Sequence, residues 1–467
     1  MRPGRFILMA VIAMSTLWAC NPVTPDVPDD TPSAPESMSI DKDAFKVDSE
    51  GASLQFVVTS PLRPAVESDS GWVTVADGVY KDYKITYGLK VAANESESDR
   101  VATITVTAGS FKKTLKVTQE GREETPDPDP DPGSEVNITK TLVTPGATAK
   151  AQALYNYLLE TYGSKVISGI MANVNWNHEE ADKVHTATGK YPALNCYDFI
   201  HILYSGQNWI DYSKLTPVTE WADAGGIVAL MWHFNVPKSK DAGLSDVTCT
   251  PSETTFRASN VFKDGSWENK WFYEQMDKVV EVILALQDKG IAAIWRPFHE
   301  AAGNATAINQ ANWTKAWFWW GYDGAEIQKK LWKTMFDYFY SKGIRNLIWV
   351  WTTQNYNGNA SAYRQDKDWY PGDEYVDIVG RDLYGYNSAQ NAQEFTEIQA
   401  AYPKKMVTLA ECGRTQDAVF ASIPEAWAKG AKWSWFMPWY GSSMPDTAWW
   451  KTALNSDKVL SRSDIKI

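Results

Sequence analysis

The sequence predicts two folded parts: a small all-β, immunoglobulin-like sandwich followed by an α/β domain built as a (β/α)8 TIM barrel. Residues 37–121 contain runs in which apolar and polar side chains alternate with a period of two, as in half-buried strands. Residues 122–136, rich in proline and aspartate, predict a stiff linker. Residues 137–467 alternate short apolar runs with longer amphipathic segments, which is the pattern of βα units.

Eight apolar runs in the second part predict eight strands. They are residues 166–170, 192–197, 227–234, 291–298, 346–351, 376–382, 406–410 and 432–438. Amphipathic helical patterns lie between them, for example over residues 272–289 and 324–342. Eight βα units over this length predict a closed barrel with long loops at the carboxyl ends of its strands. The alternative is an open doubly wound sheet, but such a sheet usually carries a Gly-rich first turn that this sequence lacks.

The composition excludes several classes of function. The chain has 467 residues and a net charge of −12, which argues against nucleic acid and against an anionic polymer as partner. No phosphate-binding loop, dinucleotide fingerprint or zinc-peptidase motif is present, and the cysteines lack zinc-ligand spacing. We therefore expect no metal ion and no organic cofactor, and we expect a monomer.

The aromatic content is unusual. The chain contains 23 Trp and 22 Tyr, most of them after residue 150. Aromatic rings stack on the apolar C–H faces of sugars while their N–H and O–H groups meet hydroxyls, although any single ring is more often a large core residue. The abundance favours a carbohydrate as ligand.

The amino terminus predicts export and anchoring. Residues 1–19 combine arginines with an apolar run, as a bacterial signal peptide does, and the run ends in a lipobox-like segment at Cys20. Residues 20–36 are rich in Pro and Asp and predict a disordered tether. We expect a lipoprotein of the outer membrane, held in the membrane through a lipid at Cys20 and facing the cell surface or the periplasm. The alternative is an ordinary secretory signal with an incidental cysteine.

Charged residues at two strand ends predict the catalytic centre. An apolar run leads into Trp295-Arg296-Pro297-Phe298-His299-Glu300, and a second leads into Glu411. Ionised groups are costly to bury without partners, and a barrel carries its chemistry at the carboxyl ends of its strands. Two carboxyl groups on the fourth and seventh strands can approach to the ~5–5.5 Å of a retaining glycosidase. The alternative is that each glutamate belongs to an unrelated salt bridge.

Two stretches of the sequence resemble known families. Residues 37–121 resemble the BACON domain, for which either glycan binding or a spacer role is expected. The matching segments are Phe56-Val57-Val58-Thr59-Ser60, Trp72-Val73-Thr74-Val75, residues 99–109 and Leu115-Lys116-Val117-Thr118-Gln119. Residues 140–460 resemble glycoside hydrolase family 26. The motifs that carry this resemblance are Arg296-Pro297-Phe298-His299-Glu300 and Trp317-Phe318-Trp319-Trp320-Gly321.

The second resemblance implies a retaining endo-β-1,4-mannanase that acts on mannan, glucomannan or galactomannan, with Glu300 as acid/base and Glu411 as nucleophile. It also implies roles for six other residues that would contact the sugar or the carboxylates, with Asp382 orienting its neighbours. These six are His233 in the subsite of the reacting sugar, Arg296 lowering a carboxylate pKa, His299 positioning the sugar or Glu300, Trp317 as a sugar platform, Tyr384 donating to Glu411, and Trp439 stacking beneath the sugar. Trp435 competes with Trp439 because both have the same strand parity, and an insertion separates Trp317 from Glu300.

Two other functions stay open. Another β-glycanase of the same family is possible: a β-1,3-xylanase, a mixed-linkage glucanase or a mannobiose-releasing enzyme. A non-catalytic glycan-binding lipoprotein on a degenerate barrel is the alternative from another class, and the presence of both glutamates argues against it.

Overall fold

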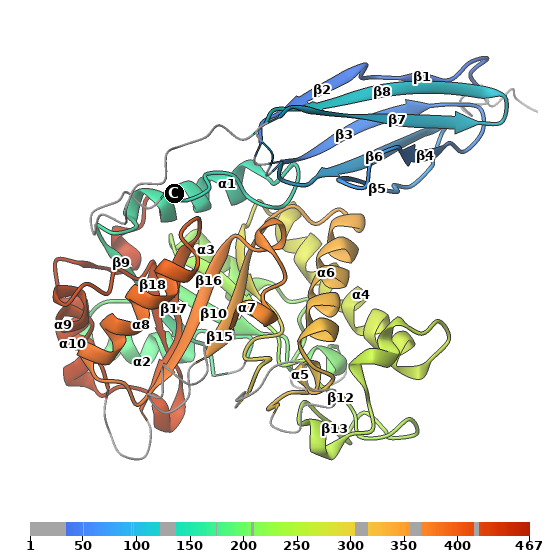
Figure 1. Cartoon of the computed structure of the whole chain (residues 1–467). Coiled ribbons are helices and arrows are strands. Elements are labelled where there is room, and N and C mark those ends of the chain that lie inside the picture. Colours follow the sequence, from blue (N-terminus) through green and yellow to red (C-terminus); the bar gives the residue numbers. More distant parts are fainter. Residues whose placement is uncertain are drawn as a thin grey trace, which may run out of the picture.

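The computed structural model describes most of the chain and shows a β-sandwich beside a barrel (Figure 1). The described residues are 34–49, 51–94, 96, 98–121, 137–173, 175–206, 210–303, 316–354, 366–414 and 420–467. The signal peptide, Cys20, most of the tether and the linker therefore lie outside the described residues. Among the described helices, none combines the length and apolarity needed to cross a bilayer.

The first part of the chain forms two four-stranded sheets that enclose one apolar core. One sheet has the order β1-β3-β6-β5 and the other β2-β8-β7-β4. The strands are β1 (Ser39–Ile40), β2 (Ala44–Val47), β3 (Ala52–Thr59), β4 (Ala65–Ser68), β5 (Val73–Ala76), β6 (Lys84–Val91), β7 (Arg100–Ala108) and β8 (Phe111–Gln119). Alternate residues of the strands are buried, for example Ile85, Tyr87, Leu89 and Val91 on β6, which confirms the all-β prediction.

The second part closes into a barrel of eight parallel strands, as predicted. Their order is β10-β11-β14-β15-β16-β17-β18-β9, and β9 also pairs with β10, which closes the ring. The strands are β9 (Val166–Met171), β10 (Leu194–Asp198), β11 (Ile227–Met231), β14 (Ala293–Arg296), β15 (Leu347–Gln354), β16 (Ile378–Tyr384), β17 (Met406–Gly413) and β18 (Trp435–Pro438). Each predicted apolar run contributes one strand, so the doubly wound alternative is wrong.

Helices surround the barrel and connect its strands (Figure 1). They are α1 (Ala149–Thr161), α2 (Glu179–Thr188), α3 (Thr216–Asp223), α4 (Trp267–Asp288), α5 (Trp319–Tyr322), α6 (Ala325–Ser341), α7 (Asp366–Trp369), α8 (Ser388–Ala401), α9 (Ile423–Ala428) and α10 (Thr447–Leu454). Short strands β12 (Val236–Pro237) and β13 (Val247–Thr248) form a separate hairpin, and β19 (Val459–Leu460) pairs with β9. The helix α4 begins at the N-cap Ser266, whose side chain accepts from Asn269 N, and presents an apolar face to the barrel.

The sandwich contacts the barrel beside the end of α6. Lys90 Nζ on β6 lies 3.2 Å from the centre of the Tyr375 ring and 3.9 Å from Glu374. Gln55 on β3 contacts the Tyr340 hydroxyl near the carboxyl end of α6. In a (β/α)8 barrel this end of a helix leads to the amino end of the next strand, so the contact lies away from the carboxyl ends that carry the chemistry.

Candidate active site

Four charged side chains converge at the carboxyl ends of β14, β16 and β17; β16 and β17 are paired, and β15 lies between β14 and β16. Arg296 ends β14, Asp382 lies on β16 and Glu411 on β17, while Glu300 follows β14 by four residues. Glu300, Asp382 and Glu411 each place one carboxyl oxygen within 4.8 Å of the other two, and all four side chains are buried. The structure therefore brings the two predicted catalytic glutamates to the separation of a retaining pair.

A β-bulge turns Glu411 toward Asp382. Along β16 and β17, Arg381 pairs with Leu409 but Asp382 pairs with Glu411, so Ala410 has no partner in the register. Without this extra residue, Glu411 would point to the opposite side of the strand from Asp382. The bulge thus places both carboxylates on the inner side, while Arg381 and Glu394 form a buried ion pair toward α8.

Glu300 lies in a loop of unusual backbone conformation. Phe298 and Glu300 have φ angles of 46° and 50°, in the left-handed region that few residues other than glycine adopt. Glu300 N donates to Thr352 O on β15 at 3.3 Å, which fixes the loop to the neighbouring strand. Such strained residues persist only where the surroundings hold them, and they cluster at functional sites.

The aromatic segment Trp317–Gly321 supports this loop. Trp320 Nε1 donates to the His299 carbonyl at 2.8 Å. A Cβ atom at Gly321 would lie 1.8 Å from the Ala301 carbonyl oxygen, so only glycine permits this approach. The segment and the loop carrying Glu300 are therefore packed together even though residues 304–315, between them in sequence, lie outside the described residues.

Two donors hold the Glu411 carboxylate. Arg296 Nη2 pairs with Glu411 Oε1, and the Tyr384 hydroxyl donates to Glu411 Oε2 at 2.7 Å. Arg296 also contacts Asp382 Oδ2 through Nη1 at 3.2 Å. Burial raises the pKa of Tyr384 well above its usual range, with Glu411 adding to the effect, so its hydroxyl keeps its proton.

The surroundings of Glu300 favour the neutral form of its carboxyl group. Burial raises the pKa of Glu300 well above its usual range, and the nearby Asp382 and Glu411 carboxylates raise it further, while Arg296 acts in the opposite direction. Asp382 Oδ1 is buried and receives no hydrogen bond from the N–H groups of the described residues. Glu300 and Asp382 are hydrogen-bonded to each other, and burial and the Glu411 charge also raise the pKa of Asp382 well above its usual range, while Arg296 and the bond from Glu300 act in the opposite direction. The raised pKa favours the protonated form of Glu300, which is the form that can donate a proton.

Four aromatic rings form one wall beside the carboxylates. The His233 ring, following β11, lies 4.7 Å from the His299 ring, 5.8 Å from Phe318 and 5.9 Å from Trp439, measured between centres. Burial, with Arg296 and His233 adding to the effect, lowers the pKa of His299 well below its usual range. His299 is therefore a neutral hydrogen-bonding group.

Two rings considered from the sequence have different positions. Trp435 is buried in the barrel core, whereas Trp439 is half-buried beside His233. Trp317 is half-buried. In the same segment, the ring of Phe318 contacts both His233 and His299, and the sequence analysis did not select it.

Asp198 was also missed. It ends β10, is fully buried, and pairs through Oδ2 with His233 Nδ1, while Oδ1 accepts from His233 N at 3.0 Å. The argument that identified Glu300, a charge ending an apolar strand, applies equally to Asp198 after the run 192–197 and could have found it.

The three carboxylates have spacings that could suit a cation. Among the described residues, no other group of acidic, His or Cys side chains has such spacing. Arg296 already places its guanidinium against two of the three carboxylates, and a guanidinium cannot be deprotonated in a protein. A positive charge of the chain itself thus balances the cluster.

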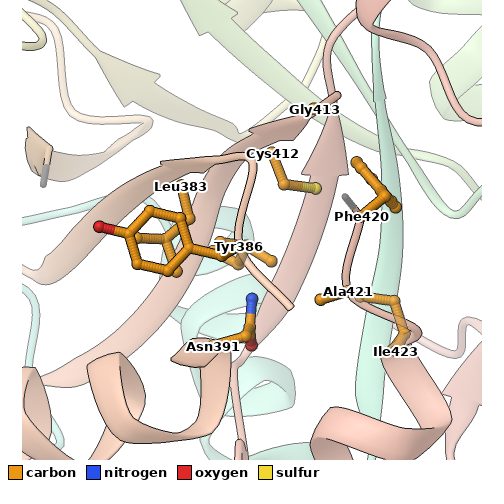
Figure 2. Close-up of a pocket in the computed structure, with 9 residues that line it drawn as sticks. Leu383, Tyr386, Asn391, Cys412, Gly413, Phe420, Ala421 and Ile423 are labelled. Carbon is orange, nitrogen blue, oxygen red and sulfur yellow. The ribbon is translucent and has the colours of Figure 1, made fainter. Parts of the chain in front are cut away.

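A small apolar pocket lies on the outer side of β17 and is separate from the carboxylates (Figure 2). Its lining includes Leu383 and Cys412, each next in sequence to a carboxylate residue and so pointing to the opposite side of its strand. Burial raises the pKa of Cys412 well above its usual range, which leaves it an unreactive thiol. The pocket belongs to the packing of β17 against α8 and α9.

A (β/α)8 barrel with a buried pair of glutamates, one following the fourth strand with a raised pKa and one on the seventh strand held by donors, defines the class of retaining glycoside hydrolases. The chain belongs to glycosyl hydrolase family 26, whose model matches residues 143–462. Residues 65–120 match the BACON model, described as a putative binding domain.

Individual relatives agree with this assignment. The chain is 32% identical over 352 residues, 71% of its length, to a mannan endo-1,4-beta-mannosidase of Thermothelomyces thermophilus. It spans 64% of that relative and 48% of each of two such proteins of Piromyces sp.

Solved structures give the same family. The family-26 domain of an endo-beta-mannanase/endo-beta-glucanase of Prevotella bryantii is 55% identical, with a TM-score of 0.68, covering 70% of this chain and 100% of that domain. A beta-mannanase of a symbiotic protist of the termite Reticulitermes speratus was solved with a gluco-manno-oligosaccharide. It is 31% identical with a TM-score of 0.59, and the match covers 71% of this chain and 99% of that one.

Proposed function

We propose that this protein is a retaining endo-β-1,4-mannanase that cleaves mannan, glucomannan or galactomannan by double displacement. The observation that carries the proposal is the contrast between two buried carboxyl groups in one site. Glu300 has a raised pKa, whereas Glu411 is held by Arg296 and Tyr384. Glycoside cleavage with retention needs one protonated and one ionised carboxyl at this spacing.

In the first step Glu411 attacks the anomeric carbon of the reacting sugar while Glu300 transfers its proton to the departing glycosidic oxygen. The C–O bond to the leaving sugar breaks as the ester to Glu411 forms. In the second step Glu300, now ionised, takes a proton from water, which attacks the same carbon and releases Glu411. The chain supplies every group that these steps require, and the anomeric configuration is retained.

The surrounding residues position the sugar and the carboxylates. Trp439 lies beside His233 and offers its face to the apolar side of the reacting sugar. His299 is a neutral group next to both Glu300 and His233 and is suited to a sugar hydroxyl. Trp317 is assigned to the platform for the neighbouring sugar. Arg296, Asp382 and Tyr384 act on the substrate through Glu411 and Glu300.

The assignment of mannan rests on the relatives. Both the curated relatives and the solved structures carry mannanase names, and one structure was solved with a gluco-manno-oligosaccharide. A second β-glycanase activity is an outcome of the substrate test below.

Lipid anchoring at Cys20 in the outer membrane completes the proposal and rests on the sequence of residues 1–20. The sandwich contacts the barrel away from the carboxyl ends of its strands, where the carboxylates lie. Replacement of Cys20 by Ala should release the protein from the membrane fraction; a protein that still sediments with membranes would be held by another segment.

The decisive test measures reducing sugar released from locust-bean gum, glucomannan, mixed-linkage glucan and β-1,3-xylan. We expect release from the first two by the wild-type protein and none by Glu411→Ala. Glu274→Gln is a control, because this glutamate lies on the surface of α4, where it pairs with Lys270. Equal release by wild type and Glu411→Ala would remove Glu411 from the mechanism. No release from any of these polymers would favour a glycan-capture protein.

A further inference from the structure

His233 has one ring nitrogen turned to the protein and one left for a ligand. Nδ1 pairs with Asp198 Oδ2, and the imidazole is only 12% exposed. Among the described residues, Nε2 has no hydrogen-bond partner, and the rings of His299 and Trp439 lie close by. A histidine in this position can make one further hydrogen bond, and its direction depends on where the proton is.

Asp198 is built into the fold so that its two oxygens have different tasks. Asp198 ends β10 opposite Met231 on β11, so the ends of two adjacent strands bring it to His233. Oδ1 accepts from the backbone N–H groups of Ile200, at 2.8 Å, and His233, at 3.0 Å. Only Oδ2 is left for the imidazole. The side chain is fully buried and thus separated from bulk solvent.

We infer that Asp198 is a positioning residue of the enzyme: it holds the proton of His233 on Nδ1 and presents Nε2 to a hydroxyl of the reacting sugar. A carboxylate can only accept hydrogen bonds, so a nitrogen that faces it must carry a proton. In the uncharged ring Nε2 is then an acceptor. This inference rests on the proposed function for the identity of the sugar, but the state of the ring does not depend on it.

Replacement of Asp198 by Asn reverses the arrangement without changing its shape. The two backbone N–H groups require an oxygen at the Oδ1 position, so the amide NH2 must face His233 Nδ1. Nδ1 then has to accept a hydrogen bond from this amide, so the ring proton moves to Nε2. A protonated Nε2 can no longer accept a hydrogen bond from a sugar hydroxyl. A similar exchange of aspartate for asparagine beside a catalytic histidine acts through the tautomer in serine proteases.

The first measurement is the NMR spectrum of protein labelled with 15N-histidine, assigned by means of His233→Ala. We expect Nδ1 of His233 to carry a proton in the wild type and to lose it in Asp198→Asn. Asp182→Asn is the matched control, because His178 Nδ1 lies 3.0 Å from Asp182 Oδ2 on the surface of α2. An unprotonated Nδ1 in the wild type would overturn the inference even if the variant failed to fold.

The second measurement is a double-mutant cycle on mannohexaose. Asp198→Asn should lower kcat/KM about 10- to 100-fold, the range seen when the partner that orients a metal-ligating histidine is lost, whereas Asp182→Asn should leave it unchanged. The loss should vanish when His233 is already Ala, because Asp198 acts through that ring. An undiminished loss in the His233→Ala background would show a merely structural role. A wild type inactive on every β-glycan, with the expected NMR result, would instead contradict the proposed substrate and leave the inference standing.

Discussion

The raised pKa of Glu300 predicts how the enzyme responds to the removal of Asp382. In Asp382→Asn a neutral amide replaces a carboxylate that lies within 4.8 Å of the Glu300 carboxyl and raises its pKa. Glu300 must be protonated to act as the acid, so kcat/KM falls as the pH rises through its pKa. Loss of a neighbouring negative charge lowers that pKa, and the alkaline limb of the pH profile moves to lower pH.

The magnitude follows from the geometry. Two unit charges at 4.8 Å, the upper limit of the separation between these carboxyl oxygens, interact by about 3.5 kcal/mol at an effective dielectric constant of about 20. This equals about 2.5 pH units. Arg296, which contacts Asp382 at 3.2 Å, screens part of this interaction, and the raised pKa of Asp382 itself reduces the negative charge that the substitution removes. We therefore expect a shift of about 1–2 pH units.

The assay is kcat/KM for mannohexaose across the pH range in which the protein stays folded. Asp377→Asn provides the control, because Asp377 is buried before β16 at the opposite end of the barrel and accepts from Val143 N and Trp349 N at 2.7 Å each. Its alkaline limb should coincide with that of the wild type. An alkaline limb of Asp382→Asn that stays in place or moves upward would refute the electrostatic reasoning.

Three further variants test the supports of the site. Tyr384→Phe removes the 2.7 Å hydrogen bond to Glu411; at about 1.5–3 kcal/mol for a bond to a charged group, kcat/KM should fall about 10- to 150-fold at unchanged Tm, and a smaller loss would exclude this role. Gly321→Ala places a Cβ 1.8 Å from Ala301 O and should lower the free energy of unfolding by about 1–3 kcal/mol, seen as a lower Tm in thermal unfolding. Gly243→Ala, with open space around it, should leave the Tm unchanged. Equal Tm values for the two variants would contradict the close packing at Gly321. Glu300→Ala should fail on polymers yet react with aryl glycosides that have very good leaving groups, and unchanged polymer hydrolysis would remove its role as acid.

The barrel could be predicted because each strand carries its own evidence. Eight apolar runs, each followed by an amphipathic segment, fix the number of βα units and place Glu300 and Glu411 at the same end of the barrel. Strand boundaries were less predictable: β14 stops at Arg296, four residues before Glu300. The end of the strand is set by backbone hydrogen bonds to the neighbouring strands, which cannot be predicted from the local composition.

The remaining details of the site depend on the backbone and on contacts between distant segments. The bulge at Ala410 and the left-handed backbone of Glu300 have no local signature in the sequence. Phe318 was passed over because residue type alone favoured the neighbouring Trp317 as the platform. The pairing of Asp198 with His233 follows from the adjacency of β10 and β11, which becomes visible only when the barrel is assembled.

The identity of the nucleophile is the central claim, and a trapped intermediate tests it most directly. The reagent is a 2-deoxy-2-fluoro glycosyl fluoride of a β-1,4-manno-oligosaccharide. The fluorine at C2 slows both displacements, but the good fluoride leaving group accelerates the first, so the ester accumulates on the nucleophile. Mass spectrometry of the digested protein should locate one added glycosyl group on the peptide that contains Glu411, and on none from Glu411→Ala. A glycosyl group on any other residue of the wild type would contradict the account.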